Sequence, residues 1–271
     1  MRRTFSGTRR LAAVAALVAL LPLGAVATAS AQPASARPLP ADFAGVPSRT
    51  ALVLDCAGTR IATPNAAESR PGLSEVKLFI VDYAIRRGDG SAGDRDLAAD
   101  MITSSDDYAA SQLDRKYPSA IDSIADEYGL TSTSRGSFWG DSYTSAADLV
   151  TFLEGVKRLH PDSPIPGWMA AATPVASDGT DQNWGTSQLI GVQGTKWGWA
   201  DDISTAVASA SIGPGFSVAA ITLGGPSDQN EDVQAALGGV DLARSQPTAP
   251  ALPEWKPGET LEQIVRSILG S

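Results

Sequence analysis

The sequence has few of the residues on which metal sites and disulfides depend. It contains one histidine, His160, and one cysteine, Cys56. These counts exclude a cluster of histidine ligands, a cysteine-rich zinc site and any disulfide within the chain. We favour a buried apolar role for Cys56 over a reactive or intermolecular thiol.

Basic residues are outnumbered by acidic ones. Lys and Arg total 21 against 30 Asp and Glu, which gives a formal net charge of −9 at pH 7. An acidic surface repels phosphate backbones, so we expect no nucleic-acid partner. The acidic runs Asp94–Asp100 and 201–202 lack the spacing of a calcium-binding loop, and we interpret them as solvated surface rather than a metal site.

The N-terminal apolar run is too short for a typical membrane span. Leu11–Val26 follows a basic segment, and a membrane-spanning helix needs about 20 residues. The run leads to Ala29–Ala31, a small-residue site of the kind that signal peptidases cut. We therefore predict a signal peptide at residues 1–31, cleavage after Ala31, and a secreted product without stable membrane insertion. An uncleaved anchor is the alternative.

The rest of the chain divides into a leader, a domain and a tail. Residues 32–48 are rich in proline and predict an extended leader without its own core. Residues 49–245 are expected to form one domain. In the tail, Gln246–Pro257 is a proline-rich linker and Glu259–Leu269 a short amphipathic helix. We expect this helix to pack on its own domain; docking to a partner is the alternative.

Hydrophobic periodicity within the domain predicts a strand, then helices, then strands and a final helix. Strands are expected at Thr50–Asp55, Leu189–Trp197, Ser204–Ile212 and Phe216–Leu223. Helices are expected at Ser74–Arg87, Asp94–Thr103, Asp106–Lys116, Ser119–Tyr128, Ala146–Leu159 and Asp228–Ala243. This order predicts an α+β fold in which both ends of the domain contribute to one antiparallel sheet, with a helical insertion at about 90–188.

The segment Ser74-Glu75-Val76-Lys77 carries the main chemical signal. Residues i and i+3 share a helix face, so the Ser74 hydroxyl and the Lys77 amine can meet. Ser74 lies in the first helical turn, where free backbone N–H groups favour a developing oxyanion. Lys77 adjoins an apolar run, and a desolvated lysine has a lowered pKa and can take the serine proton. From this pattern alone, a helix cap at Ser74 and an outward-pointing lysine is the simpler interpretation.

Two further segments extend the pattern to a family resemblance. Residues 103–110 (TSSDDYAA) and 194–199 (GTKWGW) follow S-x-x-K in the order of the S-D-N and K-T-G segments of class A β-lactamases and penicillin-binding proteins. Residues 48–243 therefore resemble that family of serine hydrolases. The resemblance implies a β-lactamase/transpeptidase-like fold, an antiparallel sheet flanked by helices. The short interval between Ser74 and Ser105 predicts a reduced all-helical subdomain.

The resemblance also implies roles for individual residues. Ser74 would be the acylated nucleophile, Lys77 its base and Ser105 the relay of a proton to the leaving group. Lys196 would supply positive charge near the substrate carboxylate. The backbone N–H groups of Ser74 and Trp199 would form the oxyanion hole. The resemblance implies that the protein needs no cofactor. It also implies a small-molecule or peptide substrate, with peptidoglycan-derived peptides among the candidates.

Three features depart from the family pattern. Asp107 stands where the family has Asn, and its negative charge would favour a protonated Lys77. Trp197 replaces the small hydroxyl residue before Gly198, and its indole would fill space that a β-lactam carboxylate uses. Asp107, Trp197 and Gly198 are expected to contact the substrate. Residues 131–143 contain no glutamate to activate a deacylating water. Efficient β-lactam hydrolysis is therefore not expected.

Two functional hypotheses follow. The first is an exported serine hydrolase or acyltransferase that forms an acyl-enzyme on Ser74. The second is a protein of the same fold that binds a ligand without turnover, for which Asp107 and Trp197 argue. Several tryptophans either line a substrate cleft or pack in the core: Trp139, Trp184, Trp197 and Trp199.

Overall fold

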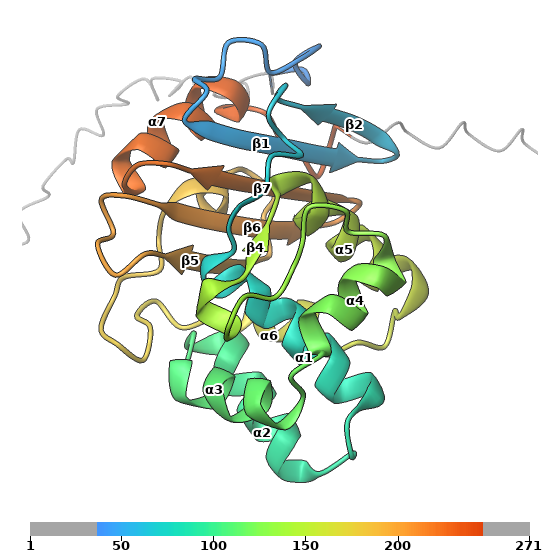
Figure 1. The fold of residues 1–271 in the computed structure, drawn as a ribbon. Coiled ribbons are helices and arrows are strands. Elements are labelled where there is room, and N and C mark those ends of the chain that lie inside the picture. The colour runs from blue at the N-terminus through green and yellow to red at the C-terminus, as the bar shows by residue number, and fades with distance from the viewer. Residues whose placement is uncertain (1–36, 246–271) are drawn as a thin grey trace, which may run out of the picture. The chain divides into compact units, whose positions relative to one another are not determined.

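Both ends of the domain contribute strands to one antiparallel sheet with the order β2-β1-β7-β6-β5. The computed structural model describes residues 37–245. The strands are β1 (Thr50–Cys56), β2 (Thr59–Ala62), β5 (Gly194–Trp199), β6 (Val207–Gly213) and β7 (Phe216–Thr222). β1 pairs with β7 along its whole length, from Thr50 opposite Thr222 to Cys56 opposite Phe216. This pairing places the first strand beside the C-terminal meander β5-β6-β7 (Figure 1).

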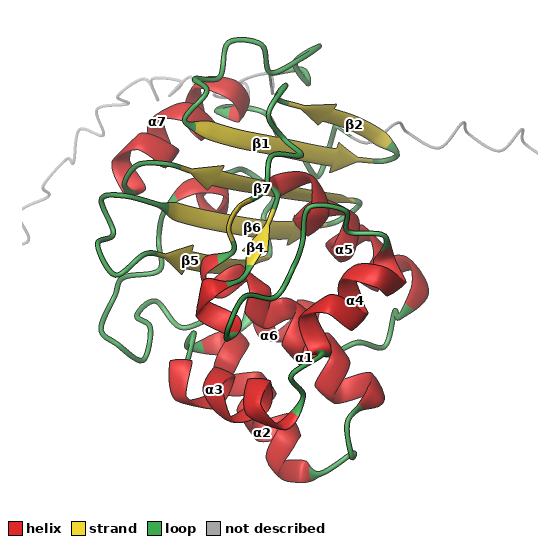
Figure 2. Cartoon of the chain, in the orientation of Figure 1, coloured by secondary structure: helices red, strands yellow, loops and turns green. Residues whose placement is uncertain are grey.

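Helices cover the sheet and extend from it as a helical subdomain (Figures 1 and 2). The helices are α1 (Lys77–Arg87), α2 (Ala92–Thr103), α3 (Asp107–Lys116), α4 (Ala120–Tyr128), α5 (Ala146–Leu159), α6 (Ile165–Ala170) and α7 (Pro226–Leu237). Three 3-10 helices are η1 (Leu73–Val76), η2 (Trp139–Asp141) and η3 (Gly185–Gln188). A small ladder joins β3 (Arg70–Pro71) to β4 (Tyr143–Thr144). η1 packs on β5 and leads directly into α1, which brings the start of that helix to the edge of the sheet.

Alternate side chains of β1 supply two separate apolar layers. Ala51 and Val53 join the layer that contains α1 and α5, whereas Leu52 and Leu54 join the layer on the α7 face. All four side chains are fully buried. Because both faces are covered, the strand has a continuous apolar sequence rather than an alternating one.

The structure confirms the α+β fold class and the antiparallel sheet flanked by helices. α5 has the predicted bounds, Ala146–Leu159. Its start is fixed locally, because the Ser145 hydroxyl accepts a hydrogen bond from the Asp148 N–H at 3.0 Å.

Two predicted bounds were wrong by more than four residues. The expected strand Leu189–Trp197 begins only at Gly194, because the preceding residues form η3 and a turn. The expected helix Asp228–Ala243 ends at Leu237, where two glycines follow and Gly239 takes a φ of 77°.

Several short elements were not predicted, β2 and α6 among them. β2 has four residues of which only Ile61 is buried, and α6 has six residues. Neither is long enough to display a hydrophobic period. The helix expected at Ser74–Arg87 begins as the 3-10 turn η1.

Residues 37–48, the described part of the predicted leader, pack on the domain. Phe43 is 2% exposed and lies in the apolar layer on the α7 face. Arg37 forms a bridge with Val240, which follows α7. This segment therefore shares the core of the domain.

Several predicted segments lie outside the described residues. They are the signal peptide at 1–31, the start of the leader at 32–36, the linker Gln246–Pro257 and the helix Glu259–Leu269. Within residues 37–245, no helix combines the length and apolar character needed to cross a membrane.

Candidate active site

Ser74 lies in η1 at the entrance to α1. It is 6% exposed, and the residue before it, Leu73, has a φ of 51°. Ser105 has a φ of 56°. The left-handed region costs a residue with a β-carbon roughly 1–2 kcal/mol, and such strain gathers at functional sites. Tertiary packing therefore holds the backbone at Leu73 and at Ser105 in an unfavourable conformation.

Lys77, the first residue of α1, points at the segment that carries Ser105. Its Nζ donates to the Ser105 carbonyl oxygen at 2.7 Å, to Ser105 Oγ at 3.3 Å and to Asp107 Oδ1 at 2.5 Å. The side chain is fully buried, and the Trp139 ring centroid lies 4.6 Å from Nζ. Burial lowers the pKa of Lys77, and the Asp107 carboxylate opposes this by raising it.

Lys196 approaches the same hydroxyl from β5. Its Nζ donates to Ser105 Oγ at 2.7 Å and to the Trp197 carbonyl oxygen at 2.7 Å. The side chain is fully buried. Burial, together with the charge of Lys77, lowers the pKa of Lys196 to about 7. Two buried lysines thus meet at one serine hydroxyl.

Gly198 allows β5 to approach Ser74 closely. A β-carbon at Gly198 would lie 2.8 Å from the Ser74 backbone nitrogen and 2.8 Å from Leu73 Cβ. Only a residue without a side chain fits this contact. The backbone of β5, which continues to Trp199, therefore lies directly beside η1.

No protein-family model matches the chain, and no curated protein matches it. Among solved structures, PBP-A is similar with a TM-score of 0.55 and 17% identity, over 72% of this chain and 89% of that one. A carbapenemase from Vibrio cholerae is similar with a TM-score of 0.54 and 14% identity, over 70% of this chain and 94% of that one. The chain has the β-lactamase and penicillin-binding-protein fold.

Another similar structure is penicillin-binding protein D2 from Listeria monocytogenes in its ampicillin-bound form. It has a TM-score of 0.51 and 18% identity, and the match covers 69% of this chain and 94% of that one. The β-lactamase and penicillin-binding-protein fold is thereby confirmed as the fold that the motifs predict. Within it, the structure brings Lys77, Ser105 and Lys196 into hydrogen-bond contact with one another.

Asp107 and Trp197, the two substituted positions, have different surroundings. The Asp107 side chain is 67% exposed while it pairs with buried Lys77. Trp197 is 7% exposed and lies with Trp184 and Val207, and its Nε1–H donates to the Trp184 carbonyl oxygen at 3.0 Å. Because neighbouring strand residues face opposite sides, Trp197 points away from the side of β5 that carries Lys196. Little of the indole surface is therefore accessible to a substrate carboxylate.

The other tryptophans named from the sequence divide between the site and the core. Trp139 covers Lys77 and donates from Nε1 to Ser111 Oγ at 3.2 Å. Trp184 is 2% exposed and packs edge-to-face against Trp199. Trp199 is partly exposed, so it is the member of this pair that can meet a ligand.

Glu75 is a site residue that the sequence reasoning missed. It lies between Ser74 and Lys77, is fully buried, and neither of its carboxyl oxygens has a hydrogen-bond partner among the described residues. Burial raises the pKa of Glu75 to about 8, while the charge of Lys196 lowers it. A charged residue followed by a long apolar run was the available signal, but the S-x-x-K pattern leaves this position unspecified.

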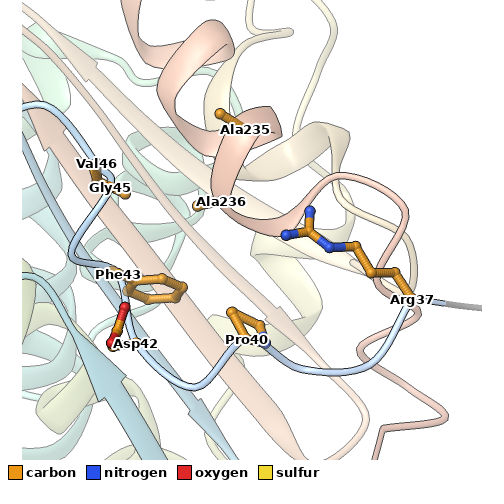
Figure 3. A pocket seen from close by; sticks show the side chains of 8 residues that line it. All are labelled: Arg37, Pro40, Asp42, Phe43, Gly45, Val46, Ala235 and Ala236. Carbon is orange, nitrogen blue, oxygen red and sulfur yellow. The ribbon is translucent and has the colours of Figure 1, made fainter.

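A groove elsewhere on the domain is separate from this site (Figure 3). It is lined by residues of the leader, among them Pro40, Phe43 and Val46, and by Ala235 and Ala236 of α7. These elements lie on the α7 face of the sheet, whereas η1 and α1 lie on the opposite face. We assign no role in the reaction to this groove.

Proposed function

We propose that this chain is an exported serine hydrolase or acyltransferase that forms an acyl-enzyme on Ser74. The observation that carries the proposal is that the Ser105 hydroxyl accepts hydrogen bonds from both Lys77 and Lys196, while the same strand, β5, approaches Ser74 closely at Gly198. Two amines and a hydroxyl in contact can accept and return a proton, which is what nucleophilic catalysis without histidine requires. The predicted signal peptide supports export.

The proposed reaction begins with attack by the Ser74 hydroxyl. Its oxygen forms a bond to the acyl carbon, its proton passes to the lysine–serine cluster, and the leaving group departs with a proton returned through Ser105. The N–H groups of Ser74 and Trp199 would stabilise the oxyanion. Lys196 would attract a substrate carboxylate. Amides or esters, cell-wall peptides included, are the proposed substrates.

A second function, ligand binding without turnover, is favoured by one specific observation. The three N–H groups of Lys77 are occupied by Ser105 and Asp107, and Ser74 is not among its hydrogen-bond partners in residues 37–245. A protonated, fully bonded lysine cannot act as a base in this arrangement.

Labelling of the protein with acylating probes separates the two functions. The mature chain is incubated with a fluorophosphonate and, separately, with a penicillin, and its intact mass is measured. The enzyme hypothesis predicts one adduct per chain from at least one probe and none in Ser74→Ala. Absence of adduct from both probes, with a cooperative unfolding transition that shows the protein is folded, would support ligand binding instead.

We further expect any penicillin adduct to persist for hours. Within residues 131–143 the one carboxylate, Asp141, is exposed and accepts from Ser137 Oγ, and the group over Lys77 is the Trp139 ring. No carboxylate of that segment is placed to activate a deacylating water. The decay of the adduct mass after removal of free penicillin measures this. Release within seconds, as efficient hydrolysis requires, would contradict it.

A further inference from the structure

The two buried lysines that meet at Ser105 differ in their negative partners. Lys77 donates to a carboxylate, Asp107 Oδ1. Among residues 37–245, Lys196 donates only to neutral oxygens, Ser105 Oγ and the Trp197 carbonyl. Burial disfavours the ammonium form of both lysines, but only Lys77 has an ion pair that opposes it. Lys196 is therefore the lysine that loses its proton more readily.

The surroundings of Lys196 agree with this difference. The elements that pack most extensively on β5 are β6, α6, η1 and η3. Of these, β6, α6 and η3 carry no titratable side chain. η1 contributes Glu75, whose burial raises its pKa to about 8. At neutral pH Glu75 is mostly protonated, so it supplies little negative charge to hold Lys196 as an ammonium ion. The charge of Lys77 disfavours that ammonium further, and Asp107 favours it.

Burial is the largest effect on Lys77 and lowers its pKa, but the contacts of its ammonium group oppose that effect. Its Nζ donates to three acceptors, which is the full capacity of an ammonium group. The Trp139 ring at 4.6 Å adds a cation–π contact, and the nearby charges of Asp106 and Asp178 also raise its pKa. Every one of these contacts favours the charged form.

We propose that Lys196, acting through the Ser105 hydroxyl, is the base that takes the proton of Ser74, while Lys77 remains an ammonium ion paired with Asp107. This inference rests on the proposed function and changes the role that the family resemblance implies for Lys77. As the Ser74 oxygen bonds to the acyl carbon, its proton moves to Ser105 Oγ, and the Ser105 proton moves to Lys196 Nζ. The same path returns the proton to the leaving group as its bond to the acyl carbon breaks.

Arginine substitutions distinguish the two lysines, because a guanidinium keeps the positive charge and cannot act as a base. The probe is a fluorophosphonate, which has no carboxylate to attract; Ser74 bonds to phosphorus and fluoride leaves. Labelling of the wild type is expected to rise with pH around a midpoint near 7. Lys196→Arg should lower the labelling rate at pH 8 at least about 100-fold, the usual contribution of a general base. Lys77→Arg should lower it by no more than about tenfold and keep the same midpoint.

Lys116→Arg, at an exposed lysine of α3, is the matched control and should match the wild type. The proposal is overturned if Lys77→Arg loses labelling while Lys196→Arg retains it. If an arginine variant does not fold, 13C-ε-lysine NMR titration of the wild type decides. The Lys196 resonance is then expected to titrate near pH 7 while that of Lys77 does not, and the reverse order overturns the proposal. If neither the fluorophosphonate nor penicillin labels the wild type but Lys196 titrates first, the proposed function fails and the protonation order stands.

Discussion

Glu75→Gln is expected to make the protein more stable relative to wild type as the pH rises, by about 3 kcal/mol between pH 5 and pH 8. Glu75 is fully buried, and its pKa is raised from 4.5 to about 8. The folded state therefore keeps a proton that the unfolded chain has lost. The wild type has its full stability below pH 4.5 and loses this contribution as the pH rises towards 8. Glutamine has the same shape and does not titrate.

Urea unfolding of both proteins at several pH values measures this difference. Comparing the variant with the wild type removes the contribution of every other titrating group, since those groups are common to both chains. Glu231→Gln is the control, because the Glu231 side chain is 77% exposed and should change stability by less than about 1 kcal/mol at each pH. Parallel curves for wild type and Glu75→Gln would show that Glu75 titrates as an ordinary glutamate.

The sequence was sufficient to predict the fold and the cluster of polar residues. Three short segments in the right order placed Ser74, Ser105 and Lys196 on a helix start, a loop and a strand. Those local elements depend on nearby residues: the Asp106 carboxylate, for example, accepts from the Ala109 N–H and begins α3 at Asp107. Local signals of this kind can be read from a single sequence.

The properties of the site that depend on tertiary burial could not be predicted in the same way. Asp107 does raise the pKa of Lys77, as its charge suggested, but burial of the lysine is the larger effect. Glu75 becomes a buried, unpartnered carboxyl only because η1 packs on β5 and β6, which lie more than a hundred residues later in the sequence.

The orientation of Trp197 could have been predicted from strand geometry. Residues of a strand alternate between its two faces, so a residue that follows Lys196 points to the opposite side. Its burial with Trp184 is the outcome of that alternation. The contact of the Trp139 ring with Lys77 has no such local signal. It depends on how the loop after α4 returns to the site.

Gly198→Ala is expected to reduce labelling of Ser74 by at least about 100-fold, the cost of losing one oxyanion-hole donor. The added β-carbon would lie 2.8 Å from the Ser74 nitrogen and 2.8 Å from Leu73 Cβ, so β5 and η1 must separate. Leu73 is already held at a φ of 51°, which leaves little freedom for η1 to adjust. The separation would displace the N–H groups of Ser74 and Trp199 from each other.

The labelling rate with the fluorophosphonate, measured by intact mass, tests this expectation, and thermal unfolding reports the accompanying loss of stability. Gly93→Ala is the matched control: it lies in α2, where a β-carbon meets no atom within 4 Å, and alanine favours a helix. That variant should label at the wild-type rate. If Gly198→Ala also labels at the wild-type rate while folded, the close approach of β5 to η1 is a packing contact and the oxyanion donors lie elsewhere. A slower rate confined to Gly198→Ala places the reacting oxygen between the two segments.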